Sequence, residues 1–147
     1  MYDVLVNIVK SHSRIENPKY ESENAAGMDL RAFLDSAVIL PPLGRVKIPT
    51  GIKIELPQGY EAQVRPRSGL AIKTGLTVLN SPGTIDADYR GDIEIILINL
   101  GEMDVTINDG ERIAQLVITP VSRAKIMEVE KLSPSQRGSA GFGSTGI

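Results

Sequence analysis

Short runs of alternating apolar and polar residues recur along most of the chain, and proline or glycine separates many of them. In residues 51–56, isoleucine or leucine occupies every second position. An alternation of period two places apolar side chains on one face of a β-strand. Strands spaced by about 8–12 residues are typical of an all-β sandwich or barrel. We predict strands in residues 4–9, 37–56, 60–64, 84–85, 93–100, 105–107, 111–118 and 125–129.

Only one helix is predicted, and the chain changes character near its end. Ser68 is a suitable N-cap, residues 70–74 can form about two turns, and Gly75 suits a C-terminal stop. Four of the last ten residues are glycine, so we expect poor order there in the free protein. The prediction is one β domain over residues 1–132, followed by a flexible tail over residues 133–147.

The composition limits the chemistry that the chain can perform. Its 147 residues suffice for one domain with its own core. It contains no cysteine and one histidine, so thiolate metal sites and Ser-His-Asp catalysis are poorly supplied and acid–base chemistry falls to carboxylates. A net charge of -2 argues against a general nucleic-acid binder. The chain lacks a signal-peptide pattern and an apolar run of ~18 residues, so we expect a cytoplasmic protein without a membrane partner.

Polar side chains that could hold a nucleoside gather in residues 80–92. Proline and glycine within this stretch are strong turn signals, and we predict a β-hairpin that carries Asn80, Asp86, Asp88, Tyr89 and Arg90. Such a set offers hydrogen bonds for a base, a carboxylate for a water molecule and a flat ring for a sugar. A surface hairpin with ordinary polar residues at its tip explains the pattern equally well.

A candidate anion site precedes the predicted helix. Arg67 and the free backbone N–H groups of Ser68 and Gly69 could surround a phosphate, and an ordinary capped helix with a solvated arginine is the alternative. Gln115 lies among apolar neighbours in a predicted strand, where it could bind a ligand or satisfy a backbone group. Asp29 follows small residues, and we expect it to be a structural carboxylate that caps turn amides.

The tail combines flexibility with groups that could cover a nucleotide. It holds Phe142, one of only two phenylalanines in the chain, between glycines. Phe142 could lie on a flat base, Arg137 could meet a phosphate, and hydroxyl and backbone N–H groups could bind the remaining acceptors. We favour a lid that closes over a ligand, and a disordered linker is the alternative.

Five separated stretches of the chain form a recognisable set. They are Ala26-Gly27-Met28-Asp29-Leu30, Pro66-Arg67-Ser68-Gly69-Leu70, residues 83–91, Gly110-Glu111-Arg112-Ile113-Ala114-Gln115 and residues 137–146. In this order and at these separations, they resemble the five motifs of the homotrimeric deoxyuridine triphosphatase (dUTPase) family. Each stretch alone is a modest match, whereas all five together are highly specific, and the resemblance covers nearly the whole chain.

The resemblance implies hydrolysis of dUTP to dUMP and pyrophosphate, which keeps uracil out of DNA and supplies dUMP for dTMP synthesis. It implies a distorted jelly-roll or β-barrel domain that assembles as a homotrimer with three active sites between subunits. Mg²⁺ is the implied cofactor, and we expect it to bind the triphosphate and reach the protein through water molecules, without a direct protein ligand.

The resemblance also implies roles for individual residues. Asp86 would hold and activate the attacking water and meet the sugar 3′-hydroxyl, and Tyr89 would lie under the deoxyribose and leave no room for a 2′-hydroxyl. Asn80, Thr84 and Ile85 would contact uracil. The phosphates would be bound by Arg67, Ser68, Gly69 and Gln115. The tail would reach the nucleotide with Arg137, Phe142, Gly143 and Ser144.

Two other functions use the same scaffold. A dCTP deaminase-like enzyme would need a residue set that attacks C4 of the base, and the stretch around Arg67 and the tail with Phe142 fit the hydrolase better. A non-catalytic regulator would bind dUTP without releasing pyrophosphate, and the presence of Asp86 together with a complete tail argues against it.

Overall fold

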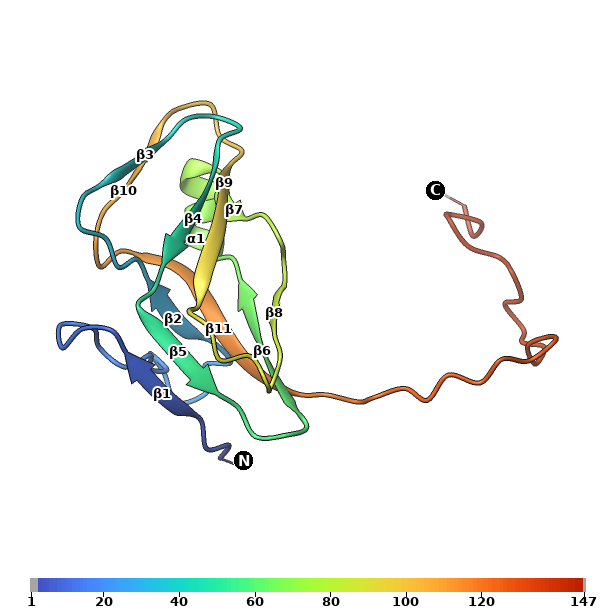
Figure 1. Cartoon of the computed structure of the whole chain (residues 1–147). Helices are drawn as coiled ribbons and strands as arrows, with labels where there is room; N and C mark the ends of the chain where they lie inside the picture. The colour runs from blue at the N-terminus through green and yellow to red at the C-terminus, as the bar shows by residue number, and fades with distance from the viewer. Residues whose placement is uncertain (1–2, 147) are drawn as a thin grey trace.

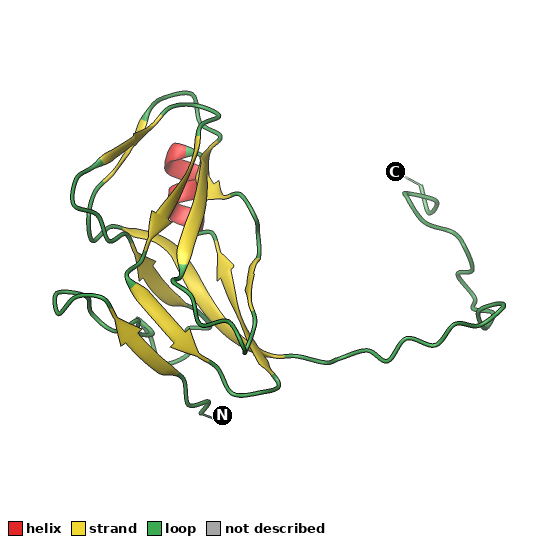
Figure 2. Ribbon diagram, viewed as in Figure 1, coloured by secondary structure: helices red, strands yellow, loops and turns green. Residues whose placement is uncertain are grey.

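The computed structural model describes residues 3–146, so Met1, Tyr2 and the last tail residue, Ile147, lie outside the described part. The described chain is built from β-strands with one short helix (Figure 2), as the alternation predicts. The elements are β1 (Asn7–Lys10), β2 (Met28–Arg31), β3 (Val38–Leu40), β4 (Arg45–Pro49), β5 (Ile52–Glu55), β6 (Tyr60–Arg65), α1 (Ser68–Thr74), β7 (Leu76–Val78), β8 (Gly83–Ile85), β9 (Glu94–Asn99), β10 (Val105–Ile107) and β11 (Arg112–Pro120).

The strands form four antiparallel sheets around one core (Figure 1). The largest sheet has the order β2-β11-β6-β8, and a second has the order β4-β9-β7. Two smaller sheets pair β1 with β5 and β10 with β3. Every sheet contributes to the same buried apolar cluster, for example through Leu116, Leu97, Ile54 and Ile107. The non-sequential strand order is the arrangement expected of a sandwich or jelly-roll rather than of a simple meander.

Burial follows the predicted alternation in most strands. In β9, Ile95, Leu97 and Asn99 are buried, and the residues between them are partly buried. In β11 burial departs from a simple alternation, because the register with β2 shifts between Arg112 and Ala114. This irregularity lets the consecutive residues Ile113 and Ala114 both be buried.

The predicted helix is present, and it ends where the sequence indicates. Gly75 has a left-handed backbone with φ of 77°, and its N–H donates to the Ala71 carbonyl. A β-carbon at Gly75 would lie 2.3 Å from the Gly101 nitrogen, so glycine is also required for close packing. The predicted N-cap is wrong by one residue: Arg67 has the extended N-cap backbone, with no side-chain cap, and Ser68 is already helical.

The predicted strand at residues 125–129 is wrong. Residues 121–146, which we call the C-terminal segment, leave the body beyond β11 and run outward without strand or helix (Figure 1). Ile126 and Met127 are exposed there. A strand requires a hydrogen-bonded neighbour, and the alternation alone does not supply one. No helix within residues 3–146 is long and apolar enough to cross a membrane.

Candidate active site

Residues 80–92 connect two sheets instead of forming the predicted hairpin. β8 pairs with β6 in the largest sheet, whereas β9 pairs with β4 and β7 in the second sheet. The turn between them therefore lies where the two sheets meet at one end. The prediction of a polar turn is confirmed, and only the strand pairing is wrong, because turn signals do not specify which strands pair.

Five of the predicted site residues line one cavity, which we call the crossover pocket: Asn80, Thr84, Ile85, Asp86 and Tyr89. Its volume is about 170 Å³. Sequence reasoning missed the pocket residues outside the polar turn, which are Val64, Ile93, Glu94 and Ile96. The apolar ones also follow the strand alternation, so nothing in the sequence distinguishes them from ordinary core residues.

Backbone and side-chain contacts fix the shape of the crossover pocket. Ile85, which directly precedes Asp86, is buried in β8 and anchors this end of the turn. The Tyr89 N–H donates to the Asp86 carbonyl over 3.1 Å, which closes the turn. The Tyr89 hydroxyl donates to the Asp92 carbonyl over 3.0 Å. The exposed Asp86 carboxylate is thus carried on a backbone held from both sides.

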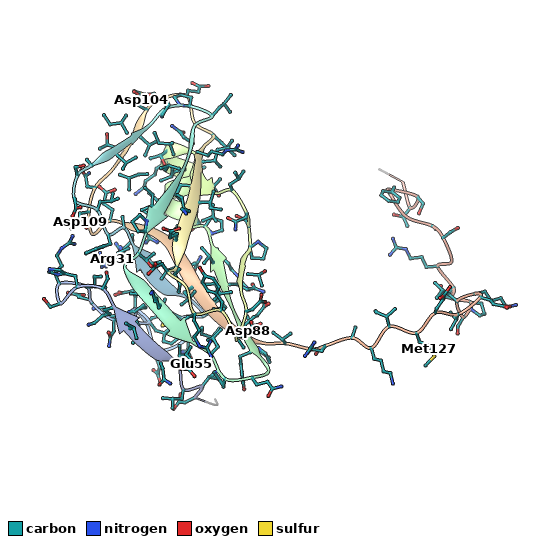
Figure 3. The ribbon with its side chains drawn as sticks, viewed as in Figure 1. Arg31, Glu55, Asp88, Asp104, Asp109 and Met127 are labelled. Atoms are coloured by element: carbon teal, nitrogen blue, oxygen red, sulfur yellow. The ribbon has the colours of Figure 1, made fainter. Side chains whose placement is uncertain are left out.

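Ion pairs hold the turn and the start of β9 to neighbouring strands. Arg90 donates to the Ala87 carbonyl over 2.6 Å and lies 3.6 Å from the Glu55 carboxylate. Figure 3 shows Asp88 of this turn and Glu55 at the same end of the body. Glu94, which lines the pocket, pairs with Lys47 over 2.7 Å. The hydrogen bond to Glu94 raises the pKa of Lys47 above its ordinary value.

A second group of site residues forms an arginine cluster, which consists of Asp29, Arg67, Arg112 and Gln115. The Asp29 carboxylate accepts from Arg67 over 3.0 Å and from Arg112 over 3.3 Å. Asp29 is therefore a structural carboxylate, as expected, but its partners are arginine side chains rather than turn amides. It lies in β2, a strand that the sequence pattern did not predict, and its charge orients two arginines.

Gln115 has a structural partner in this cluster. Its side-chain nitrogen donates to the Pro66 carbonyl over 2.9 Å, just before Arg67. A β-carbon at Gly27 would lie 2.4 Å from the Gln115 side-chain oxygen, so the glycine allows close packing. Of the two alternatives for Gln115, satisfaction of a backbone group is realised. Ser68 and Gly69 follow Arg67 at the start of α1 and are exposed.

The tail residues lie apart from both groups. Arg137 donates to the Ala140 carbonyl over 2.7 Å, and Phe142 is exposed with φ of 51°. Gly143 and Ser144 are exposed as well. Figure 3 shows Met127 on the outward course of the C-terminal segment, away from the body. The structure thus brings the tail residues neither to the crossover pocket nor to the arginine cluster.

A larger cavity of about 340 Å³ lies between residues 14–21, β2 and the turn before β11. In its wall, one guanidinium nitrogen of Arg14 donates to both carboxylate oxygens of Asp109, at 2.9 and 3.0 Å, and Arg14 also lies 4.0 Å from the centre of the Phe33 ring. The hydrogen bond from the Leu34 N–H lowers the pKa of Asp109, with further help from Arg14. Because these charges neutralise each other, this cavity is a weaker candidate for substrate.

The fold and the two residue groups define a β protein with a small pocket lined by polar side chains and a separate cluster of arginines around a carboxylate. The family model described as dUTPase matches residues 13–146. This chain therefore belongs to the dUTPase family.

Individual proteins that resemble this chain in sequence or structure also have names of the dUTPase family. The chain is 60% identical over 129 residues to "Deoxyuridine 5'-triphosphate nucleotidohydrolase" of Cytophaga hutchinsonii, with 88% of this chain and 84% of the relative covered. It is 48% identical over 146 residues to the protein of that name from Fusobacterium nucleatum, with 99% of each covered. The solved structure of the Staphylococcus bacteriophage 80alpha dUTPase G164S mutant with dUpNHpp matches with a TM-score of 0.84 and 28% identity, and the match covers 97% of this chain and 99% of that one.

Proposed function

We propose that this chain hydrolyses dUTP to dUMP and pyrophosphate, with Asp86 as the general base. The observation that carries this assignment is that Asp86 lines one pocket together with Asn80 and Tyr89, in a chain of the dUTPase family. In the cytoplasm this reaction would keep uracil out of DNA and supply dUMP for dTMP synthesis.

The proposed mechanism assigns the proton transfer to a carboxylate. Asp86 would orient a water molecule in line with the phosphorus atom, accept its proton and meet the sugar 3′-hydroxyl. A positioned general base contributes about 10²–10⁴-fold to a rate. The rest of the acceleration would come from alignment and from neutralisation of the phosphate oxygens. The held backbone around Asp86 supports this role, because it limits the directions in which the carboxylate can point.

Base and sugar selection would use the rest of the crossover pocket. Asn80 and the backbone around Thr84 and Ile85 would pair with uracil. Cytosine would leave polar groups without partners there, which is a large penalty in a closed site. Tyr89 would lie under the deoxyribose, where a 2′-hydroxyl has no room.

The phosphates would be held by the arginine cluster of a neighbouring subunit. None of the described residues that line the crossover pocket belongs to this cluster. Arg67, Ser68, Gly69 and Gln115 could therefore complete the pocket of a second copy. We infer a homotrimer with three shared sites, and the Asp29 carboxylate would pre-orient Arg67 for its phosphate.

Mg²⁺ would enter with the triphosphate and neutralise part of its charge. Within residues 3–146 there is no group of three or more His, Cys, Asp and Glu side chains able to hold a metal ion. The residues present fit an ion that keeps much of its water shell and is carried by phosphate oxygens. Asp86 is exposed and could contact such a water.

The tail would complete the site by closing over the nucleotide. Phe142 would stack on uracil, Arg137 would contact a phosphate, and Gly143 and Ser144 would contribute further hydrogen bonds. The exposure of Phe142 supports this proposal, since an aromatic side chain between glycines has no role in the core. Closure would also exclude water other than the one held by Asp86.

The reaction is tested by measuring pyrophosphate release from dUTP, dTTP, dCTP and UTP side by side, with ammonia release as a second readout. We expect pyrophosphate from dUTP alone at substantial rate. Ammonia from dCTP would show the deaminase instead. Binding of dUTP with neither product would show the non-catalytic regulator.

The shared site is tested by mixing two inactive variants. Asp86→Asn removes the base from the pocket, and Arg67→Ala removes an arginine from the cluster. If sites form between subunits, refolding the two together creates some sites with both groups intact and restores part of the activity. Activity that stays at the level of the single variants would contradict the shared site. Sedimentation checks that each variant still forms the expected trimer.

A further inference from the structure

The Tyr89 ring rests against a residue that has no side chain. A β-carbon added at Gly91 would lie 2.3 Å from the Tyr89 hydroxyl oxygen, 2.5 Å from ring atom Cζ and 3.0 Å from Cε2. Carbon and oxygen atoms that are not bonded do not approach this closely in folded proteins. The Tyr89 ring therefore occupies its position only because position 91 is glycine.

The backbone gives no other reason for a glycine at this position. Gly91 is not among the residues with positive φ, in contrast to Gly75 and Gly110. A left-handed backbone is therefore not the reason for glycine at position 91. The conflict would be with the end of a side chain, and a tyrosine ring that is 46% exposed is free to swing away.

The same hydroxyl end of the ring also bonds to the backbone. The Tyr89 hydroxyl donates to the Asp92 carbonyl over 3.0 Å, so residues 91 and 92 together hold the hydroxyl end of the ring. The ring in this orientation forms part of the wall of the crossover pocket, next to Asp86. Displacing the ring would change the shape of that wall while leaving Asp86 attached to β8.

We propose that Gly91 is a specificity-determining positioning residue, which keeps the Tyr89 ring where it excludes a 2′-hydroxyl. This inference rests on the proposed function, in which Tyr89 lies under the deoxyribose. A side chain at position 91 pushes the ring off its place and opens room for ribose. The expected effect is a loss of discrimination between dUTP and UTP, with folding intact.

The experiment compares Gly91→Ala, Tyr89→Ala and the double variant in the full chain. For each, kcat/KM is measured for dUTP and for UTP by pyrophosphate release. We expect Gly91→Ala to lower the dUTP-to-UTP ratio by about tenfold or more, the scale on which a pocket distinguishes one small group. In the Tyr89→Ala background, adding Gly91→Ala changes the ratio by less than about twofold, because the two residues act through one ring. Asp88→Ala, at an exposed position of the same turn, is the matched control and keeps the ratio.

Two further readouts separate the possible failures. The chemical shifts of ¹³C-labelled tyrosine rings report displacement of Tyr89 directly, and the melting temperature reports folding. The inference is overturned if Gly91→Ala keeps the dUTP-to-UTP ratio of the unaltered protein or leaves the tyrosine ring shifts unchanged. It is also overturned if Gly91→Ala lowers this ratio equally with and without Tyr89. If the unaltered protein releases no pyrophosphate from dUTP, the proposed function itself fails, whatever the ring shifts show.

Discussion

The crossover pocket and the C-terminal segment hold their functional side chains in opposite ways. Around the pocket, a closed turn and a buried neighbour in β8 hold the backbone that carries Asp86 and Tyr89, and a hydroxyl-to-carbonyl bond orients the Tyr89 ring. In the C-terminal segment, the hydrogen bonds of residues 137–146 are short-range, and Phe142 is exposed. The chemistry would therefore be prepared before substrate arrives, whereas the covering groups would be ordered by the substrate itself.

Ordering the tail has an energetic consequence. Fixing one residue of backbone costs about 1–2 kcal/mol, and one aromatic–base stack contributes ~1–3 kcal/mol. The Phe142 stack alone cannot order a glycine-rich tail of several residues. Contacts of Arg137 and of backbone N–H groups with charged phosphates must supply the remainder. A lid of this kind would close well on a triphosphate and poorly on a monophosphate, which would favour release of dUMP.

The largest effect is expected from the pocket. Asp86→Asn removes the base but leaves a side chain of the same shape, so turnover should fall by about 10²–10⁴-fold while nucleotide binding remains. Binding is measured by calorimetry with a non-hydrolysable dUTP analogue. Asp88→Asn, in the same exposed turn, is the control and should keep its turnover. Turnover near normal in Asp86→Asn would refute the role of this residue as base.

A smaller loss of activity is expected when the tail is removed, and the stability of the body should not change. Deleting residues 137–147 should lower kcat/KM by about 100-fold or more, since a base stack contributes ~1–3 kcal/mol and a charged hydrogen bond ~1.5–3 kcal/mol. The melting temperature should not change, because none of the described residues 137–146 belongs to the core or packs against it. Phe142→Ala should show the stacking part of the loss alone. Full activity of the truncated chain would remove the lid from the mechanism.

The same comparison explains how much of the structure the sequence could predict. Alternation located most of the strands that surround the core, because burial of one face leaves a direct record in the sequence. It missed β2 and β7, which also contribute to the core. Gly75 was predicted because a helix end needs left-handed backbone, which is a local requirement. The false strand at residues 125–129 has a similar alternation, but strand formation depends on a partner that the pattern does not contain.

Site residues could be predicted where the local sequence was unusually polar. Which of them contact one another in the folded chain could not be predicted. The polar turn with Asp86 and Tyr89 was found from its composition. The link between Asp29 and Arg67 was missed because the two lie 38 positions apart and meet only through the pairing of β2 with β11 and of β11 with β6. Gly91 was regarded only as a turn residue, since nothing in the sequence shows which side chain passes over it.

The smallest expected effect is a change in melting temperature on removal of the exposed Asp109 carboxylate from the body. Asp109 receives the Leu34 N–H over 2.8 Å and pairs with Arg14, and these contacts hold its pKa below 3.8. A lowered folded-state pKa stabilises the fold above the unfolded-state pKa, and this contribution is lost as the pH falls through the folded-state value. The melting temperature of Asp109→Asn should therefore lie slightly below that of the unaltered chain at pH 6, and the gap should narrow as the pH falls below 3.8. Asp104→Asn, at another exposed position, is the matched control for removal of a carboxylate charge (Figure 3). A gap that stays constant from pH 6 to acid pH would mean that Asp109 acts through its shape rather than its charge.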